Sequence, residues 1–242
     1  MKPESAKPET SKLETDFRLY WLARLVFGSL MKWGYRIEWV GLENVPEPGG
    51  ALFASSHGSF LDVPAIGACI KTRPVCFVAR ASLIRIPILG WFIRHWGPIL
   101  IQRGAADVAA LRAMAARARA GELVTIFPEG TRTPDGHLQE LRQGVLLAAR
   151  LARVPVIPVG IVGAFEGFPR TRKFPKLWGK IVVSFGPPIP LAELSRDADD
   201  ALPRLRLAIA AQIDRAGQLW SRSTGKPFRG ALREAALPQN RT

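Results

Sequence analysis

The sequence predicts an α/β fold, a single domain with a mostly parallel central sheet flanked by helices. Short apolar segments of strand length alternate along the chain with longer segments of helical periodicity, which is the order typical of parallel sheets. The chain of 242 residues suffices for one sizeable domain, and it shows no internal repeat. Polar and basic loops follow several predicted strands, at the sheet edge where α/β proteins bind ligands.

Residues 1–16 mix both charge signs with Pro and Ser, and we interpret them as a mobile tail without a signal peptide. Residues 17–34 are mostly apolar and aromatic and predict an amphipathic helix. Charged residues interrupt this segment, so we expect no transmembrane helix. The apolar surface is buried either in the protein core or at a lipid interface, where basic and aromatic side chains favour partial membrane contact.

We assign residues 35–221 to one domain, in which short apolar segments alternate with helical ones. The stretch "YRIEWVGL" alternates apolar and polar residues and ends at the turn "PEPGG", which is typical of a strand. The segments "ALFASS", "VCFVA" and "PILI" are short apolar runs typical of buried strands. The predicted elements are strands at 35–42, 51–56, 75–79 and 98–101, a helix from Ser59 to about Ile70, and a proline-interrupted helical stretch over 82–97.

The second half of the domain repeats the alternation. An alanine-rich segment with an acidic first turn and a following Gly predicts a helix over 105–120. A proline in the first turn is compatible with the last helix. The remaining predicted elements are strands at 122–127, 156–162 and 180–186, helices at 139–152 and 200–221, and a basic tail over 222–242.

The charge and the cysteine and histidine content indicate which kinds of partner and metal site to expect. The formal net charge of +14 indicates an anionic partner such as nucleic acid, a membrane surface or a phosphorylated substrate. Cys69 and Cys76 form no spaced framework, and we expect free thiols. The three histidines lack ligand spacing, so no metal site is expected.

The segment "HGSFLD", residues 57–62, follows a predicted strand and has two interpretations. Ser59 can cap a helix whose dipole favours the carboxylate of Asp62, which explains both residues without any chemistry. Alternatively, His57 is a general base that Asp62 orients and stabilises in its charged form. A second segment, "FPEGTRT" at 127–133, follows another strand and is either an ordinary turn or a phosphate site built around Arg132.

Together these segments resemble the glycerolipid acyltransferases, and most closely the bacterial 1-acylglycerol-3-phosphate acyltransferases. "HGSFLD" matches the His-x4-Asp signature, and "FPEGTR" matches the second hallmark. Two weaker blocks, "GPILIQR" (97–103) and "VPVIPVG" (154–160), occur in the same order, and the resemblance covers roughly residues 35 to 190. The chain departs from the pattern at four positions. Ser56 replaces a common Asn, Arg80 a common Lys and Thr133 a frequent Ser. Gln102 stands in place of the acidic or Asn residue that often precedes the arginine.

The resemblance implies transfer of an acyl group from a thioester, acyl-CoA or acyl carrier protein, to a lysophospholipid hydroxyl. It implies no further cofactor. His57 would be the base and Asp62 its partner. The acceptor and its phosphate would be bound by Arg132, Arg103, Arg80, Glu129, Gly130 and Thr131, with Glu129 accepting a hydrogen bond from a glycerol hydroxyl. The alternatives are an acyltransferase for another lysolipid, such as a lyso-ornithine lipid, and a non-catalytic protein that binds anionic lipid.

The segment "FPRTRKFPKLWGK", residues 168–180, combines five cations and three aromatic residues with no acid. Such a segment suits nucleic acid, anionic lipid headgroups or an acidic carrier protein. Beside the acyltransferase segments we expect a membrane surface and no nucleic acid. The expected location is the cytoplasmic face of the inner membrane, as a peripheral or monotopic protein.

Overall fold

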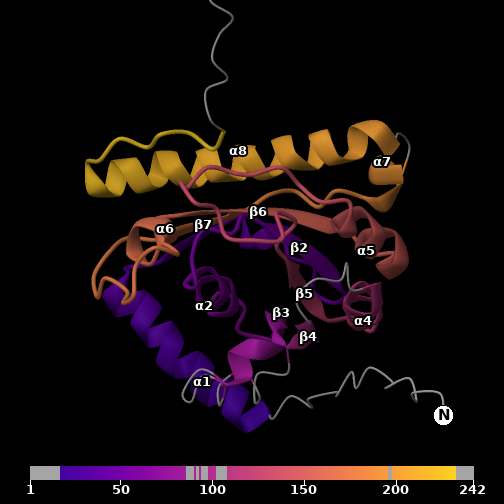
Figure 1. Cartoon of the computed structure of the whole chain (residues 1–242), viewed down its shortest axis with the longest axis horizontal. Coiled ribbons are helices and arrows are strands. Elements are labelled where there is room, and N and C mark those ends of the chain that lie inside the picture. The colour runs from indigo at the N-terminus through magenta and orange to yellow at the C-terminus, as the bar shows by residue number, and fades with distance from the viewer. Residues whose placement is uncertain are drawn as a thin grey trace, which may run out of the picture.

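The computed structural model describes residues 17–85, 90, 93, 98–101, 108–195 and 198–232, which form a central sheet with helices on both faces (Figure 1). The strands are β1 Glu38–Val40, β2 Ala51–Ser55, β3 Val75–Arg80, β4 Ile99–Ile101, β5 Leu123–Ile126, β6 Val156–Val162 and β7 Val182–Phe185. The α-helices are α1 Phe17–Ser29, α2 Asp62–Gly67, α4 Val108–Arg119, α5 Gly144–Ala152, α6 Ala164–Gly167, α7 Leu191–Ser195 and α8 Ala198–Thr224. Short helical turns are η1 Leu30–Gly34, η2 Leu42–Asn44 and η3 Ala81–Arg85.

The sheet has seven strands in the order β1-β7-β6-β2-β5-β3-β4. Strands β6, β2, β5, β3 and β4 pair in parallel. Strands β7 and β1 are parallel to each other, and β7 joins the rest through an antiparallel pairing with β6. The predicted α/β architecture with a mostly parallel sheet is therefore confirmed.

The core alternates along the strands, as a pleated sheet buried on both faces requires. Leu52 and Ala54 of β2 belong to the cluster that includes side chains of α4, α5 and α8. Ala51 and Phe53 belong to the cluster on the other face, which includes side chains of α2 and η1. Because β2 lies in the middle of the sheet, the loop that follows it emerges at the centre of one sheet edge.

Helix α8 packs across β6 and β7 at unusually close range, and Gly160 makes this possible. A Cβ atom at Gly160 would lie 2.2 Å from the backbone nitrogen of Ile213. After α8 the chain turns back along the helix (Figure 1). The backbone N–H of Ala231 donates to Asp214, and its carbonyl accepts from Leu138, so the first part of the predicted basic tail is packed against the domain.

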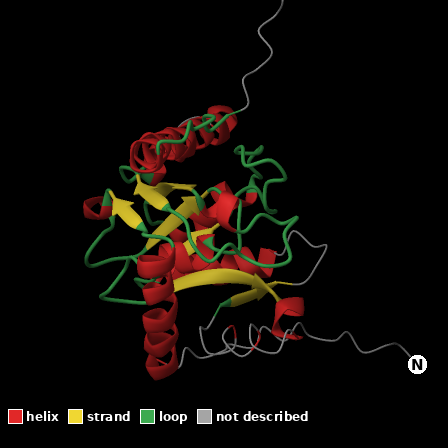
Figure 2. Ribbon diagram, turned by 90° about the vertical axis from the view of Figure 1, so that its left-hand side faces the viewer, coloured by secondary structure: helices red, strands yellow, loops and turns green. Residues whose placement is uncertain are grey.

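Helix α1 runs along one side of the domain (Figure 2), and its two faces carry different side chains. On its inner face, Tyr20 is fully buried and its hydroxyl accepts from the backbone N–H of Val75. Arg24 also turns inward, and its guanidinium donates to the carbonyls of Ala68 and Ile70. The outer face exposes large apolar side chains at helical spacing: Leu22, Leu25, Val26, Leu30 and Trp33.

Two helices begin later than the sequence predicts. The helix expected from Ser59 begins at Asp62, after a turn in which Ser59 Oγ accepts from the N–H of Leu61. The helix expected from residue 139 begins at Gly144. Here the N–H groups of Gln139 and Arg142 donate to Glu129 and Pro128, so they hold a loop in place of a helical turn.

Candidate active site

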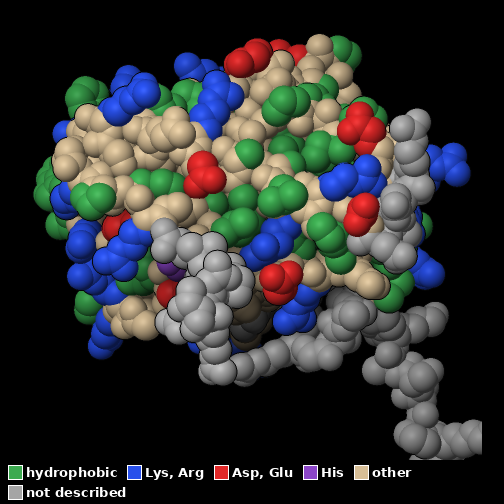
Figure 3. Space-filling model, turned by 90° about the horizontal axis from the view of Figure 1, so that it is seen from above, with side chains coloured by type: hydrophobic (Ala, Val, Ile, Leu, Met, Phe, Trp, Pro, Cys, Tyr) green, Lys and Arg blue, Asp and Glu red, His purple; other side chains and the backbone are tan. Residues whose placement is uncertain are grey.

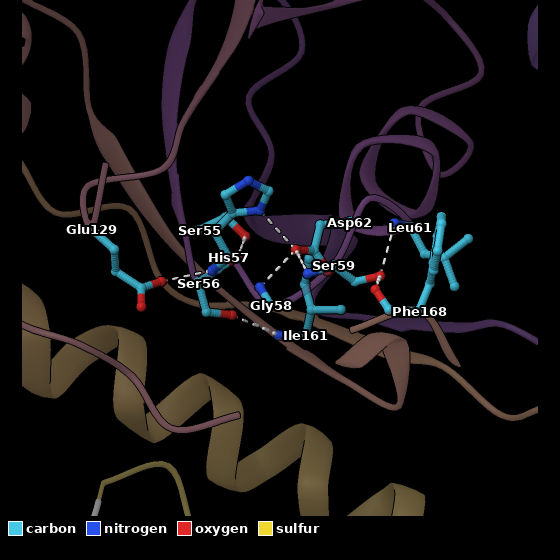
Figure 4. A network of polar contacts seen from close by, with 10 residues as sticks. All are labelled: Ser55, Ser56, His57, Gly58, Ser59, Leu61, Asp62, Glu129, Ile161 and Phe168. Carbon is cyan, nitrogen blue, oxygen red and sulfur yellow. Dashed lines mark hydrogen bonds and ion pairs between the residues drawn. The ribbon is translucent and has the colours of Figure 1, made fainter. Parts of the chain in front are cut away.

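The site is built around a contact between His57 and Asp62 at the carboxyl end of β2 (Figure 4). Nδ1 of His57 lies 2.9 Å from Oδ2 of Asp62. The same oxygen accepts the backbone N–H groups of Gly58 and Ser59, each at 2.8 Å. Because three donors converge on a carboxylate that is 1% exposed, Asp62 is held in one orientation and fixes the imidazole.

Ser59 lies in the turn before α2 and is not the predicted N-cap, because the helix begins at Asp62 and its N-cap is Leu61. Ser59 is fully buried, its Oγ accepts from the N–H of Leu61 at 3.0 Å, and its hydroxyl donates to the carbonyl of Phe168 at 2.9 Å. The bonds of Ser59 and the contact between Asp62 and His57 therefore belong to one turn ahead of α2. The N–H of Ser59 that donates to Asp62 also positions this carboxylate against His57.

The imidazole is also held by the second motif. The ring of His57 stacks on Phe127, with centroids 3.9 Å apart and an angle of 19° between the planes. The second ring nitrogen, Nε2, points away from Asp62 (Figure 4). The side chain is 18% exposed, so a small reactant can reach the imidazole. This geometry suits a general base whose outer nitrogen accepts a proton.

Glu129 is 3% exposed, and its carboxylate binds backbone N–H groups from two loops. Its Oε1 accepts the N–H of His57 at 2.7 Å, and its Oε2 accepts the N–H of Gln139 at 2.9 Å. Burial raises the pKa of Glu129 to about 7, against the opposing effect of these two N–H groups. The N–H of Thr133 donates to the carbonyl of His57 at 2.8 Å, so the second motif binds both backbone groups of that residue.

Three other predicted acceptor residues lie closer to the protein surface than Glu129 does. Arg132 is partly buried, and its Cζ lies 3.7 Å from the ring centroid of Phe60. Gly130 and Thr131 are exposed. Gly130 adopts a φ of +71° and its N–H donates to Phe127, which closes the turn before Arg132.

Two further predicted residues cannot be placed in the same way. The backbone of Arg80 ends β3, but its side chain lies outside the described residues. Arg103 lies outside them entirely.

A small hollow of about 20 Å³ opens beside His57 and Glu129. It has room for roughly one water, not for an acyl chain. His137, Phe165 and Ile213 also line it.

Sequence reasoning did not assign roles to Phe60, Phe127 or Gln139. Phe127 heads the second motif and Phe60 lies within the first, so their positions carried a signal. Gln139 lies outside both motifs and carried none, although its backbone N–H donates to Glu129 and its side-chain amide donates to Thr133 Oγ1 and to the carbonyl of His137.

Comparisons with known proteins agree with this arrangement. The sequence model of the acyltransferase family matches residues 36–162. A 1-acyl-sn-glycerol-3-phosphate acyltransferase of Pseudomonas aeruginosa is 31% identical over 193 residues, which cover 74% of this chain and 70% of that protein. The chain belongs to the acyltransferase family.

Other acyltransferases are similar over different lengths. A lyso-ornithine lipid O-acyltransferase of Pseudomonas aeruginosa is 31% identical over 119 residues, 49% of this chain and 45% of that protein. Against several plant and algal relatives, the chain spans only 38% to 53% of their length. The crystal structure of the 1-acyl-sn-glycerophosphate acyltransferase from Thermotoga maritima superposes with a TM-score of 0.67 at 25% identity, covering 82% of this acyltransferase and 78% of that chain.

Proposed function

We propose that this protein transfers a fatty acyl group from an acyl thioester to the free hydroxyl of 1-acylglycerol 3-phosphate, which gives phosphatidic acid. The observation that carries the proposal is the contact of 2.9 Å between His57 Nδ1 and Asp62 Oδ2, with the other ring nitrogen turned outward. The donor is acyl-CoA or acyl carrier protein. The names of the relatives support the choice of acceptor.

In the proposed reaction, Nε2 of His57 takes the proton from the acceptor hydroxyl as its oxygen attacks the thioester carbonyl carbon. The carbon–sulfur bond then breaks, and the proton passes to the departing thiolate. Asp62 stabilises the imidazolium in between, because its carboxylate already faces Nδ1. General-base assistance of this kind is worth roughly 10²–10⁴-fold in rate. No covalent acyl-enzyme is required, and the hydroxyl of Ser59 is committed to hydrogen bonds within the protein.

Arg132 is the proposed ligand of the acceptor phosphate, because a guanidinium can donate two parallel bonds to phosphate oxygens. Its position over Phe60 leaves the planar group oriented in advance. Arg80 and Arg103 remain proposed helpers on the strength of the family resemblance. Thr131 and Gly130 would line the approach to the phosphate, since both are exposed beside Arg132.

Glu129 receives a different role from the one expected. Both of its oxygens already accept backbone N–H groups, and the side chain is 3% exposed. A glycerol hydroxyl would have to displace one of these bonds. We therefore assign Glu129 to positioning, as the carboxylate that sets His57 against the second motif.

The acceptor is a membrane lipid, and we expect a peripheral protein at the cytoplasmic face of the inner membrane. No helix in the described part of the chain has both the length and the hydropathy to cross a bilayer. The outer face of α1 and η1 nevertheless exposes a stripe of large apolar side chains, while Arg24 bonds inward. Such a face suits the headgroup boundary of a bilayer.

A lyso-ornithine lipid is the second candidate acceptor, because a relative with that activity is 31% identical over 119 residues. A panel of lysolipid acceptors, each offered with a radiolabelled acyl thioester, separates the two. We expect lysophosphatidate to be acylated most efficiently. Acylation of lyso-ornithine lipid with lysophosphatidate ignored would favour the second candidate, and no acylation of any lysolipid would reject both.

A further inference from the structure

The loop 168–180 exposes side chains that proteins normally bury. Phe174, Leu177 and Trp178 are 69%, 67% and 73% exposed, among the highest values for large apolar residues in the described part of the chain. Three such residues in one short loop are unusual on a surface that faces only water. They indicate that this loop meets a partner.

Two hydrogen bonds hold this loop against the end of η1 and the residue that follows it. The N–H of Gly179 donates to the carbonyl of Gly34 at 3.0 Å, and the hydroxyl of Tyr35 donates to the carbonyl of Lys176. Trp33, beside Gly34, is itself 73% exposed. The loop therefore adjoins η1, and Figure 1 shows it in orange beside the end of α1.

The same loop is basic. Arg170, Arg172, Lys173 and Lys176 are all exposed, and residues 168–180 contain no acid. Lys173 Nζ lies 5.6 Å from the ring centroid of Phe174, so charge and apolar surface are interleaved. Lys180 differs, because it pairs with Glu38 at 2.7 Å. Lys and Arg side chains gather along the left margin of the view from above, on the side of this loop (Figure 3).

We propose that loop 168–180 docks on an anionic lipid bilayer, with Phe174, Leu177 and Trp178 entering the headgroup region and the four exposed cations binding lipid phosphates. Trp and Phe favour the membrane boundary, and cations beside them are attracted by acidic headgroups. Nucleic-acid bases can stack on Phe174 and Trp178 but offer Leu177 no apolar environment, whereas the boundary of a bilayer accepts all three side chains.

The base of the loop contacts the candidate site. The carbonyl of Phe168 accepts from Ser59 Oγ at 2.9 Å. The ring centroid of Phe168 lies 5.6 Å from that of Phe60, and the guanidinium of Arg132 lies over the ring of Phe60. Docking of the loop would thus place Arg132 beside the lipid surface that holds the acceptor. The role of docking in presenting the acceptor to Arg132 rests on the proposed function. The docking itself is a binding event that needs no turnover.

The test is co-sedimentation of the full chain with vesicles of phosphatidylcholine alone or mixed with phosphatidylglycerol. The apolar variant is Phe174→Ser, Leu177→Ser and Trp178→Ser. The charge variant replaces Arg170, Arg172, Lys173 and Lys176 by Gln. Matched controls replace the same number of exposed residues elsewhere: Val108, Leu147 and Leu207 by Ser, and Arg112, Arg119, Arg150 and Arg222 by Gln.

We expect the apolar variant to lose at least tenfold in partitioning onto both kinds of vesicle. A cation near an anionic surface strengthens binding about fivefold. The charge variant should therefore lose its preference for phosphatidylglycerol, while the controls stay within twofold of wild type. If the triple variant does not fold, Trp178→Phe serves instead. Brominated lipid should then quench a smaller share of the fluorescence than in wild type.

Loop variants that partition like wild type, or no less well than their controls, would overturn the proposal. Equal quenching of Trp178→Phe and wild type would also do so. Unchanged vesicle binding combined with lost binding to acyl carrier protein would assign the loop to that acidic protein. A protein that binds vesicles through this loop yet acylates no lysolipid would reject the proposed function and leave the docking intact.

Discussion

The backbone N–H of His57 donates to Oε1 of Glu129 across 2.7 Å, so the two motif loops share one buried carboxylate. The other oxygen of Glu129 accepts from Gln139, and Thr133 returns a bond to the carbonyl of His57. His57 is therefore positioned from both sides, by Asp62 at its ring and by the second motif at its backbone.

Glu129 should make the stability of the protein depend on pH. Its pKa is raised from 4.5 to about 7 by burial. Between pH 4.5 and 7, Glu129 is deprotonated in the unfolded chain but keeps its proton in the native protein. Its contribution to the free energy of unfolding is therefore complete below pH 4.5 and falls until about pH 7. The total change is roughly 3 kcal/mol. Urea unfolding from pH 4.5 to 8 should show this fall in wild type.

Glu129→Gln is the matched variant, because the amide keeps the shape and cannot ionise. The variant should lose stability overall, by roughly 1–3 kcal/mol, since one backbone N–H meets an amide nitrogen. Its stability should nevertheless change less than that of wild type between pH 4.5 and 7. Parallel pH profiles for the two proteins would show that Glu129 does not titrate in this window.

Ser59→Ala should lower stability more than it lowers turnover. The substitution leaves the buried N–H of Leu61 without its side-chain acceptor and removes the bond to Phe168. The expected loss is roughly 1–3 kcal/mol of unfolding free energy. At a temperature where the variant is folded, acyl transfer should remain within about tenfold of wild type, as expected for a residue that acts only by positioning Asp62. Abolished transfer in a folded variant would instead assign a chemical role to the hydroxyl.

Phe60 should determine how well the acceptor binds, through Arg132. The guanidinium lies 3.7 Å from its ring centroid, a contact worth about 0.5–2 kcal/mol. We expect Phe60→Leu to raise the KM for the lysolipid about twofold to thirtyfold, with the KM for the thioester unchanged. Phe60→Tyr, which keeps the ring, is the control. An equal effect of Leu and Tyr, or a change confined to the thioester KM, would separate Phe60 from the acceptor site.

Much of the fold could be predicted because its signals are local. The alternation of apolar runs with helical segments predicted the mostly parallel sheet, and that prediction is confirmed. The pairing of His57 with Asp62 could be expected because only four residues lie between them, within one turn. The antiparallel entry of β7 could not be predicted from residues 180–186, since the direction of a strand depends on the path of the preceding loop.

The place of Glu129 escaped prediction for a similar reason. Its partner lies 72 residues earlier in the chain and contributes only a backbone N–H, which no residue pattern reveals. The late start of α5 has the same origin, because Gln139 and Arg142 use their N–H groups to hold the motif loop. Arg132 could be singled out by its motif, whereas its contact with Phe60 depends on how two loops meet.

The central claim is that His57 is the general base of acyl transfer, and His57→Ala tests it most directly. We expect kcat to fall by at least about 10²-fold. Vesicle binding and thermal unfolding should stay at wild-type levels, because the backbone of residue 57 keeps its bonds to Glu129 and Thr133. Turnover close to wild type in a folded, membrane-bound His57→Ala protein would contradict the account.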